Sequence, residues 1–268
     1  MLIGICIRAK NEQSIIADWV NHYLNLGFDK IVVYDNLSSP SIKETLDNKN
    51  INGDKIELNI CDKKGNNQGG CYDETLNKYK HFDWFLFCDA DEFLWIKEGT
   101  IKEFLCKFSN DTCSVVINWI TYGMSDKKTY DINKSVFEQF CMRENYCHYW
   151  NQFIKTFVRP KLVDKIRIHF TTNKKYKSKN VYNEIIRLHE KTSFSKDNKL
   201  SDTTPVLLVH YMTLDLESML SKNTRNLEGK LFDHPGGDNT KYTLEWYTGK
   251  GRFKDNVKDE RMLKYNYN

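Results

Sequence analysis

An alternation of strand-like and helix-like segments runs through the first 95 residues and restricts the fold more than any other feature. The strand-like segments are residues 2–9, 29–36, 54–61 and 84–90, and the helix-like segments between them are residues 11–27, 39–49 and 66–80. In residues 11–27, apolar side chains recur every three or four positions and the pattern stops at Gly27, as expected of a helix. This order predicts an α/β fold with a doubly wound, mostly parallel sheet and helices on both faces.

The second half of the sequence is less regular. Residues 113–123 and 155–170 are apolar enough to predict strands, and residues 215–232 have the spacing of a helix. The stretch after that helix contains glycine-rich and proline-containing segments, which predict loops. We therefore predict one main domain over residues 1–232 and a C-terminal extension over residues 233–268.

Three acids stand in four consecutive positions where the last strand-like segment of the first half ends. The stretch DWFLFCDADEFLW, residues 83–95, places Asp89, Asp91 and Glu92 directly after an apolar run. In open α/β sheets, ligands bind beyond the carboxyl ends of the strands. Two carboxylates separated by one residue suit an octahedral Mg²⁺ or Mn²⁺. A solvated turn with a helix-capping Asp is the alternative, but the apolar strand that delivers the acids favours a metal site.

Composition and missing motifs exclude several classes of function. The chain has 40 Lys and Arg against 36 Asp and Glu, and its basic residues are spread along the sequence, which disfavours a nucleic-acid partner. No GxGxxG follows residues 2–9 and no Gly-Lys-Ser/Thr occurs. Both a dinucleotide-dependent dehydrogenase and a P-loop protein are therefore disfavoured.

The sequence also bears on location and on the thiols. No apolar run approaches the roughly 20 residues of a membrane-spanning helix, and Met1 leads into the strand-like LIGICI without the features of a signal peptide. We expect a soluble, cytoplasmic protein. The eight cysteines include no CxxC pair, and Cys6, Cys61 and Cys88 lie in apolar runs, which predicts reduced, mostly buried thiols.

Several motifs in sequence order resemble those of GT-A-fold glycosyltransferases of family 92 and the related family 2-like kind. They are ICIRAKNE (5–12), DWVNHYLNLGFDKIVVYDNLS (18–38), DWFLFCDADEFL (83–94), NWITYG (118–123), KTFVRP (155–160) and HYMTLDLESMLSKNTRN (210–226). The resemblance implies a metal-dependent, usually inverting enzyme that uses a nucleoside-diphosphate sugar, with a UDP-sugar such as UDP-galactose as the expected donor. It also implies a nucleotide-sugar-binding half over residues 1–95 and an acceptor-binding half over residues 96–232.

The same resemblance assigns the metal ligands. Asp91 is the expected ligand of Mn²⁺ or Mg²⁺, and Asp89 is expected to bind the ribose or the water shell of the metal. The third protein ligand in the family pattern is a histidine near the end of the fold, which His210 matches. A hydrogen-bonded histidine at a strand end is the alternative for His210.

The predicted nucleotide contacts lie at the ends of the first three strand-like segments and on one later helix. Asn11 is also the natural cap of the first helix, and the glycine-rich turn around residues 63–76 is equally explained as an ordinary flexible turn. The spacing of the two basic residues on the late helix puts them on one face, suited to closing over a diphosphate. The set is Arg8, Lys10, Asn11, Glu12, Asp35, Asn36, Lys64, Gln68, Asp89, Lys222 and Arg225.

Acceptor and base are less well specified. An inverting transfer needs a general base, usually a carboxylate; Asp126 is the first candidate, and Glu138 and Glu144 compete with it. Trp119 and Tyr122 are expected to stack on a sugar, although core packing explains at least one of them. The remaining predicted acceptor residues are Lys155 and Arg159, for which a diphosphate, an acidic sugar or a structural salt bridge would supply the anion.

Two other functions stay open at this stage. One is a catalytically inactive nucleotide- or sugar-binding protein of the same fold. The other is a metal-dependent nucleotidyl or phosphoryl transferase, although no convincing triphosphate loop is present. A glycan or a lipid-linked saccharide is the expected acceptor. The aromatic and basic residues 246–254 would suit peripheral contact with the inner face of a membrane, or a plain surface equally well.

Overall fold

The computed structural model contains two compact units formed by non-contiguous parts of the chain. It describes residues 1–62, 68–171, 175–187, 193, 195, 199–218 and 256–267. The first unit combines Met1–Ile120 with Tyr146–His210, and the second combines Thr121–Asn145 with Tyr211–Asn268.

A parallel sheet forms the start of the first unit. Its strands are β1 (Ile3–Ala9), β2 (Lys30–Asp35), β3 (Ile56–Ile60) and β4 (Trp84–Phe87), in the spatial order β3-β2-β1-β4. The connecting helices are α1 (Ile16–Asn25), α2 (Ile42–Asn48) and α3 (Gln68–Lys78). All three strand pairs of this group are parallel. The α/β class with a doubly wound, mostly parallel sheet, predicted from the sequence, is confirmed.

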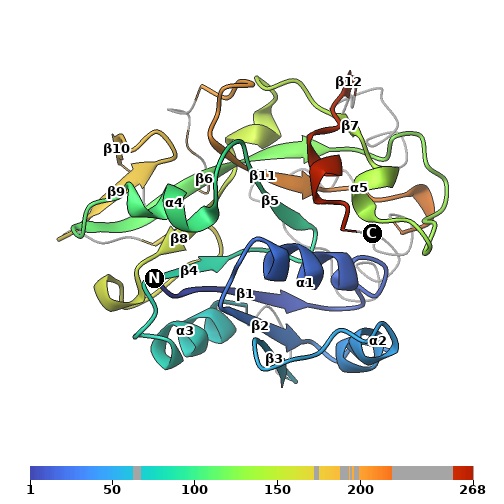
Figure 1. The fold of residues 1–268 in the computed structure, drawn as a ribbon, viewed down its shortest axis with the longest axis horizontal. Helices are drawn as coiled ribbons and strands as arrows, with labels where there is room; N and C mark the ends of the chain where they lie inside the picture. Colours follow the sequence, from blue (N-terminus) through green and yellow to red (C-terminus); the bar gives the residue numbers. More distant parts are fainter. Residues whose placement is uncertain are drawn as a thin grey trace, which may run out of the picture. The chain divides into compact units, whose positions relative to one another are not determined.

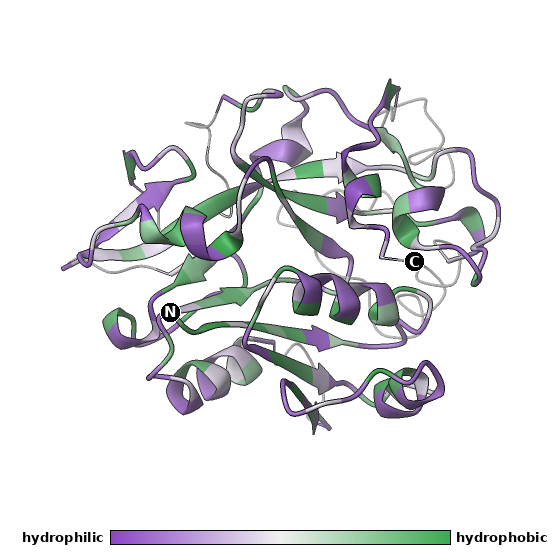
Figure 2. Ribbon diagram, viewed as in Figure 1, coloured by the Kyte–Doolittle hydropathy of each residue, from purple (hydrophilic) through white to green (hydrophobic). Residues whose placement is uncertain are grey.

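The helices α1 and α3 lie on opposite faces of this sheet (Figure 1). Side chains of a strand alternate between its two faces, so Cys6 and Val32 join the cluster that contains Tyr72 and Leu76 of α3. On the other side, α1 buries an apolar stripe and ends before Gly27, whose φ of 87° few other residues adopt. Figure 2 shows the strands as mostly hydrophobic between helices that carry hydrophilic residues on their outer sides.

Antiparallel strands extend the sheet beyond β4. The strand β8 (Ile154–Val158) pairs with β4 and with β6 (Thr112–Tyr122), β9 (Lys177–Asn180) lies parallel to β6, and β10 (Ile185–Ile186) pairs with β9. The predicted strand 155–170 is too long, because Pro160 begins the short 3-10 helix η2 (Pro160–Leu162) and proline cannot donate to the ladder.

A second strand pair follows the acids directly. The strand β5 (Glu92–Ile96) begins one residue after Asp91 and pairs with β11 (Val206–Tyr211) in an antiparallel register that sets His210 opposite Glu92. The helix α4 (Ile101–Cys106) and the 3-10 helix η1 (Tyr149–Gln152) complete the regular elements that the structure describes in this unit.

The second unit contains shorter elements. These are α5 (Val136–Gln139), β7 (Met142–Arg143), β12 (Val257–Lys258) and the 3-10 helix η3 (Arg261–Tyr265). The strands β7 and β12 pair, and Asp259 forms ion pairs with Arg143 and Arg261. The described end of the chain is therefore ordered by a strand pair and buried ion pairs, where the sequence predicted loops. Of the predicted helix 215–232, residues 216–218 are helical and residues 219–232 lie outside the described residues.

Two further observations concern the thiols and the membrane. The eight cysteines are free thiols, of which Cys106 and Cys147 are exposed, Cys141 is half-buried and five are buried. Within the described ranges of the chain, no helix has the length and apolar character needed to cross a bilayer.

Candidate functional site

A cleft opens at the carboxyl end of the parallel strands in the first unit. It has a volume of about 260 Å³. The residues that line it are Arg8, Ala9, Lys10, Glu12, Asp89, Ala90, Asp91 and His210. Three separate parts of the chain meet there, namely the end of β1, the turn after β4 and the end of β11.

The acidic turn is short and is closed by its own hydrogen bonds. It occupies the four positions between the end of β4 and the start of β5. The backbone N–H of Asp89 donates to Oε2 of Glu92 at 2.9 Å, and the N–H of Glu92 donates to the carbonyl of Asp89 at 3.2 Å. The turn separates its acids, because Glu92 is fully buried while the side chain of Asp91 retains 17% exposure.

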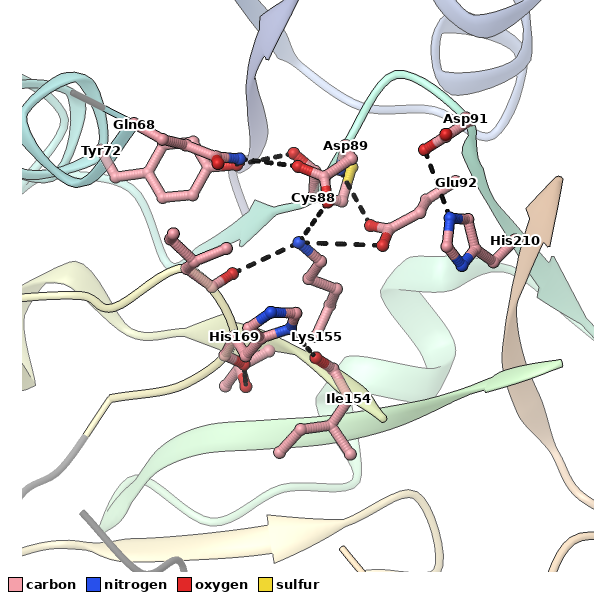
Figure 3. Close-up of polar contacts among 12 residues, drawn as sticks. Gln68, Tyr72, Cys88, Asp89, Asp91, Glu92, Ile154, Lys155, His169 and His210 are labelled. Carbon is pink, nitrogen blue, oxygen red and sulfur yellow. Dashed lines mark hydrogen bonds and ion pairs between the residues drawn. The ribbon is translucent and has the colours of Figure 1, made fainter. Parts of the chain in front are cut away.

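Both oxygens of the Asp89 carboxylate are engaged by other side chains (Figure 3). The Gln68 amide donates to Oδ1 at 2.6 Å, and Lys155 Nζ donates to Oδ2 at 2.7 Å. Burial alone would raise the pKa of Asp89, but the charge of Lys155 and its hydrogen bond outweigh burial and lower the pKa below its usual value. Asp89 is thus a charged group whose orientation is fixed from two sides.

Lys155 is a buried cation beneath the acidic turn. Its side chain has no exposed surface, and Nζ lies 2.7 Å from Asp89 and 3.7 Å from Oε1 of Glu92. Burial would lower the pKa of Lys155, yet the two carboxylates raise it. The pKa of Glu92 is raised by burial, which the charge of Lys155 only partly offsets. The sequence analysis predicted Lys155 as an acceptor contact, whereas its side chain lies under the acidic turn. The sequence indicated this buried position by a lysine inside the apolar strand FIKTFV, because a lysine buried there needs a counter-charge.

Asp91 and His210 form the second polar pair of the cleft. His210 Nε2 lies 3.6 Å from Asp91 Oδ1 (Figure 3). The Nδ1 atom of His210 is buried and makes no hydrogen bond to any residue that the structure describes. The register of β5 and β11 explains the encounter, because it sets His210 opposite the residue that follows Asp91.

The two groups fit part of a divalent-cation site. Neighbouring ligands of an octahedral Mn²⁺ lie about 3 Å apart, close to the separation of this oxygen and this nitrogen, and Mn²⁺ accepts both atom types. Asp89 is hydrogen-bonded through both oxygens, and its place at the metal or in the water shell of the metal stays a prediction. No cluster of three or more metal-ligating side chains is present among the described residues. The pair Asp91 and His210 would therefore leave other positions of the cation for a substrate.

The predicted nucleotide contacts at the end of β1 are partly brought together. Arg8, Lys10 and Glu12 line the cleft. Asn11 is not the cap of α1, contrary to prediction, because α1 begins at Ile16. Instead Asn11 has a φ of 55°, and its Oδ1 accepts a hydrogen bond from the N–H of Ser39 at 3.1 Å.

The other predicted nucleotide contacts lie beside the cleft lining or outside the described residues. Asp35 accepts from the N–H groups of Ser38 and Ile42, each at 2.9 Å, and so holds the loop that leads to α2. The backbone N–H of Asn36 donates to the carbonyl of Ala9. Lys64, Lys222 and Arg225 fall in segments that the structure does not describe.

The predicted acceptor residues in the first unit have structural partners. Trp119 is 6% exposed and lies between Phe153, stacked at 4.9 Å, and His210, at 4.2 Å between ring centroids. The guanidinium of Arg159 lies 4.1 Å over the Trp84 ring and donates to two backbone carbonyls. The described contacts of Arg159 are thus a ring and carbonyl oxygens, and its contact with an anionic ligand stays a prediction.

The remaining acceptor and base candidates belong to the second unit. Tyr122 is fully buried beside Tyr211. Asp126 is exposed in a turn, with a φ of 59°. Of its competitors, Glu138 caps α5 by accepting from the N–H of Ser135 at 2.9 Å, and Glu144 is buried. Asp126 and Glu138 are thus both exposed, and the role of Asp126 as the base stays a prediction.

Comparison with known proteins gives one assignment over most of the chain. The sequence model of glycosyltransferase family 92 matches residues 3–232. A glycosyltransferase family 92 protein of Ricinus communis is 23% identical over 135 residues, which make up 50% of this chain and 22% of that protein. The matched part is therefore less than a quarter of the length of that relative.

Similar solved structures are more distant. HddC from Yersinia pseudotuberculosis is 12% identical with a TM-score of 0.41, covering 66% of this chain and 90% of that one. Residues 1–349 of TarS from S. aureus are 15% identical with a TM-score of 0.36, covering 60% and 48%. Glucosyl-3-phosphoglycerate synthase from Mycobacterium tuberculosis, solved with Mn²⁺, UDP and glucosyl-3-phosphoglycerate, is 12% identical with a TM-score of 0.36, covering 60% and 58%.

Proposed function

The chain belongs to glycosyltransferase family 92, and from this premise we propose that it transfers a sugar from a nucleoside-diphosphate sugar to a saccharide acceptor with the help of a divalent cation. The expected donor is a UDP-sugar, and the expected acceptor is a glycan or a lipid-linked saccharide. Peripheral contact with a membrane belongs to the same proposal.

The observation that carries this proposal is the composition of the cleft. Its lining combines the Asp91 carboxylate and the His210 imidazole, which suit a cation, with Arg8 and Lys10, which suit an anion. A nucleoside diphosphate bound to a divalent cation presents both charges together. The position beyond the carboxyl ends of β1 and β4 is the usual ligand position of an open α/β sheet.

The chemistry of the proposed reaction divides between the cation and the chain. When bound, Mn²⁺ or Mg²⁺ would neutralise charge that develops on the diphosphate leaving group, with Asp91 and His210 as its protein ligands. Lys155 and Gln68 keep Asp89 ionised and oriented toward the donor. Arg8 and Lys10 balance the charge of the phosphates. Asp126 is the candidate base, which in an inverting transfer would take the proton from the acceptor hydroxyl.

A ligand-binding assay with an Asp91→Asn variant tests the proposal. We expect UDP to stabilise the wild-type protein against heat in Mn²⁺ and to do so much less in chelator, because only the folded state binds. Asp91→Asn should abolish this difference and the release of UDP from UDP-sugars. Asp47→Asn, which alters an exposed pair with Lys43 on α2, is the matched control and should behave like wild type.

The same experiment separates the alternatives. Binding of UDP without turnover of any UDP-, GDP-, CMP- or dTDP-sugar would favour an inactive binding protein. Release of pyrophosphate from a nucleoside triphosphate and a sugar phosphate would favour a nucleotidyl transferase. Unchanged Mn²⁺-dependent binding and activity in Asp91→Asn would refute the cation site.

A further inference from the structure

The start of β8 and the later part of β6 bring aromatic side chains to the ligand edge of the first unit. The strand β8 runs opposite to β4, with Thr156 beside Phe87, so residues just before Ile154 lie beyond the carboxyl end of β4. The strand β6 runs opposite to β8, with Asn118 beside Ile154, which brings the end of β6 to the same edge. Ligands of α/β sheets bind at this edge.

Four rings form a continuous series there. Trp150 stacks on Phe153 at 5.1 Å with 21° between the ring planes. Phe153 stacks on Trp119 at 4.9 Å and 15°, and Trp119 packs against His210 at 4.2 Å and 52°. The series therefore leads from η1 to the histidine that lines the cleft.

The inner ring of the series is not accessible to a sugar. Trp119 is buried between Phe153 and His210. Its indole ring therefore has no accessible face for the sugar stacking that the sequence predicted. The outer end is different, because Tyr149 keeps 54% of its surface exposed. Its ring meets Trp150 and Phe153 edge-on, at 5.8 and 6.0 Å.

The backbone holds this outer end in place. The Asn118 amide donates to the carbonyl of Asn151 at 3.0 Å and so ties η1 to β6. The N–H of Asn151 also donates to the carbonyl of His148 at 3.0 Å. An exposed aromatic residue on a fixed backbone loses little conformational entropy when it binds a ligand.

We propose that Tyr149 and Trp150, the aromatic platform, which Phe153 supports from behind, bind a pyranose ring of the acceptor saccharide. A pyranose presents a face of C–H groups that packs on an aromatic ring, while its hydroxyls stay in water. The series of rings connects the platform to His210 of the proposed donor cleft, so a sugar on the platform would belong to an acceptor saccharide that extends from that cleft. This inference rests on the proposed function for the identity of its ligand, but sugar binding is measurable without turnover.

Saturation-transfer NMR with methyl β-galactopyranoside, methyl β-glucopyranoside and methyl α-mannopyranoside tests the platform. We expect the wild-type protein to saturate at least one of these glycosides. Tyr149→Ala should reduce the effect by at least about fivefold, because an aromatic contact contributes on that order to affinity. Tyr149→Phe should retain it. Tyr267→Ala, which removes a tyrosine of the second unit that is 46% exposed, is the control and should leave it unchanged.

Binding of UDP in Mn²⁺ distinguishes failure of this inference from failure of the proposed function. Tyr149→Ala should bind UDP like wild type, since Tyr149 does not line the cleft. Absence of saturation in wild type, or equal saturation in Tyr149→Ala, would overturn the platform while leaving the donor site intact. Loss of binding to phosphatidylglycerol vesicles in Tyr149→Ala, with glycoside saturation unchanged, would overturn it in favour of a membrane contact.

Discussion

Replacing Lys155 by methionine would test whether the acidic turn depends on a buried cation. The substitution keeps the approximate shape of the side chain and removes its charge. At an effective dielectric constant of about 20, the charges of Lys155 and Asp89 at the observed 2.7 Å attract by about 6 kcal/mol. Glu92 adds less, because burial raises its pKa. Desolvation of both charged groups opposes the attraction, so the measured loss is smaller. Breaking a buried pair from one side costs about 3–5 kcal/mol, and we expect a loss in this range for Lys155→Met.

Urea unfolding followed by circular dichroism at pH 7 would measure that loss. Lys177→Met is the matched control, because it removes a lysine from an exposed pair with Asp111 at 2.6 Å and should change stability little. The double variant Lys155→Met with Asp89→Asn should regain about 1–3 kcal/mol, since the neutral amide removes the carboxylate charge that Lys155→Met leaves unpaired. It also provides a folded form if Lys155→Met alone unfolds.

A Lys155→Met variant as stable as the Lys177→Met control would refute the dependence of the turn on a buried cation. A further loss of stability from Asp89→Asn in the Lys155→Met background would refute it as well, because the Asp89 carboxylate would then not be destabilising without its counter-charge. Equal m-values of the variants would show that the denatured state is comparable.

Three other results are expected. Burial lowers the pKa of His22 to about 3, so at acidic pH the unfolded chain binds a proton that the folded chain excludes. The free energy of unfolding should therefore fall below pH 6.5, by up to about 1.4 kcal/mol per pH unit. Urea titrations at pH 7, 5 and 4 would measure this slope, which His22→Gln should flatten. A thiol reagent should react rapidly with Cys106 and Cys147 in the native protein. After denaturation it should react with all eight cysteines without any reductant, and a need for reductant would contradict the free thiols. Ser41→Ala, which removes the hydroxyl that caps α2 by accepting from the N–H of Glu44, should cost about 1 kcal/mol in thermal unfolding, and a change near zero would show that the cap is not used.

The sequence predicts the part of the fold where local pattern and final environment agree. The strands β1 to β4 are apolar segments separated by amphipathic helices, so their order alone specifies a parallel sheet. Because the carboxyl ends of such strands share one edge, residues as far apart as Arg8 and Asp91 were expected to meet, and they line the same cleft. His210 was expected at the same place from resemblance; it lies 3.6 Å from Asp91, and its role as a metal ligand stays a prediction.

The sequence does not predict features that depend on distant partners. From the sequence, Glu92 resembles a third surface acid. In the structure β5 begins at Glu92 and α1 covers it, and the side chains of Trp19 and Tyr23 donate hydrogen bonds to its backbone carbonyl. Lys155 looks like a ligand contact until its counter-charges, more than 60 residues away, are known. His22 lies on the buried stripe of α1, and its acceptor, the carbonyl of Leu94, is 72 residues distant.

The ladder between β5 and β11 has a consequence for how relatives of this protein can diverge. His210 reaches Asp91 because the two strands are paired in one register, and a shift by one residue would turn the imidazole to the opposite face. Insertions in the loops between residues 97 and 205 leave this register unchanged. A single inserted residue within β11 before His210 would instead turn the His210 imidazole away from Asp91, although every site residue would still be present. Among homologues, an invariant spacing inside β5 and β11 would therefore mark a retained site, even where the length between these strands varies widely.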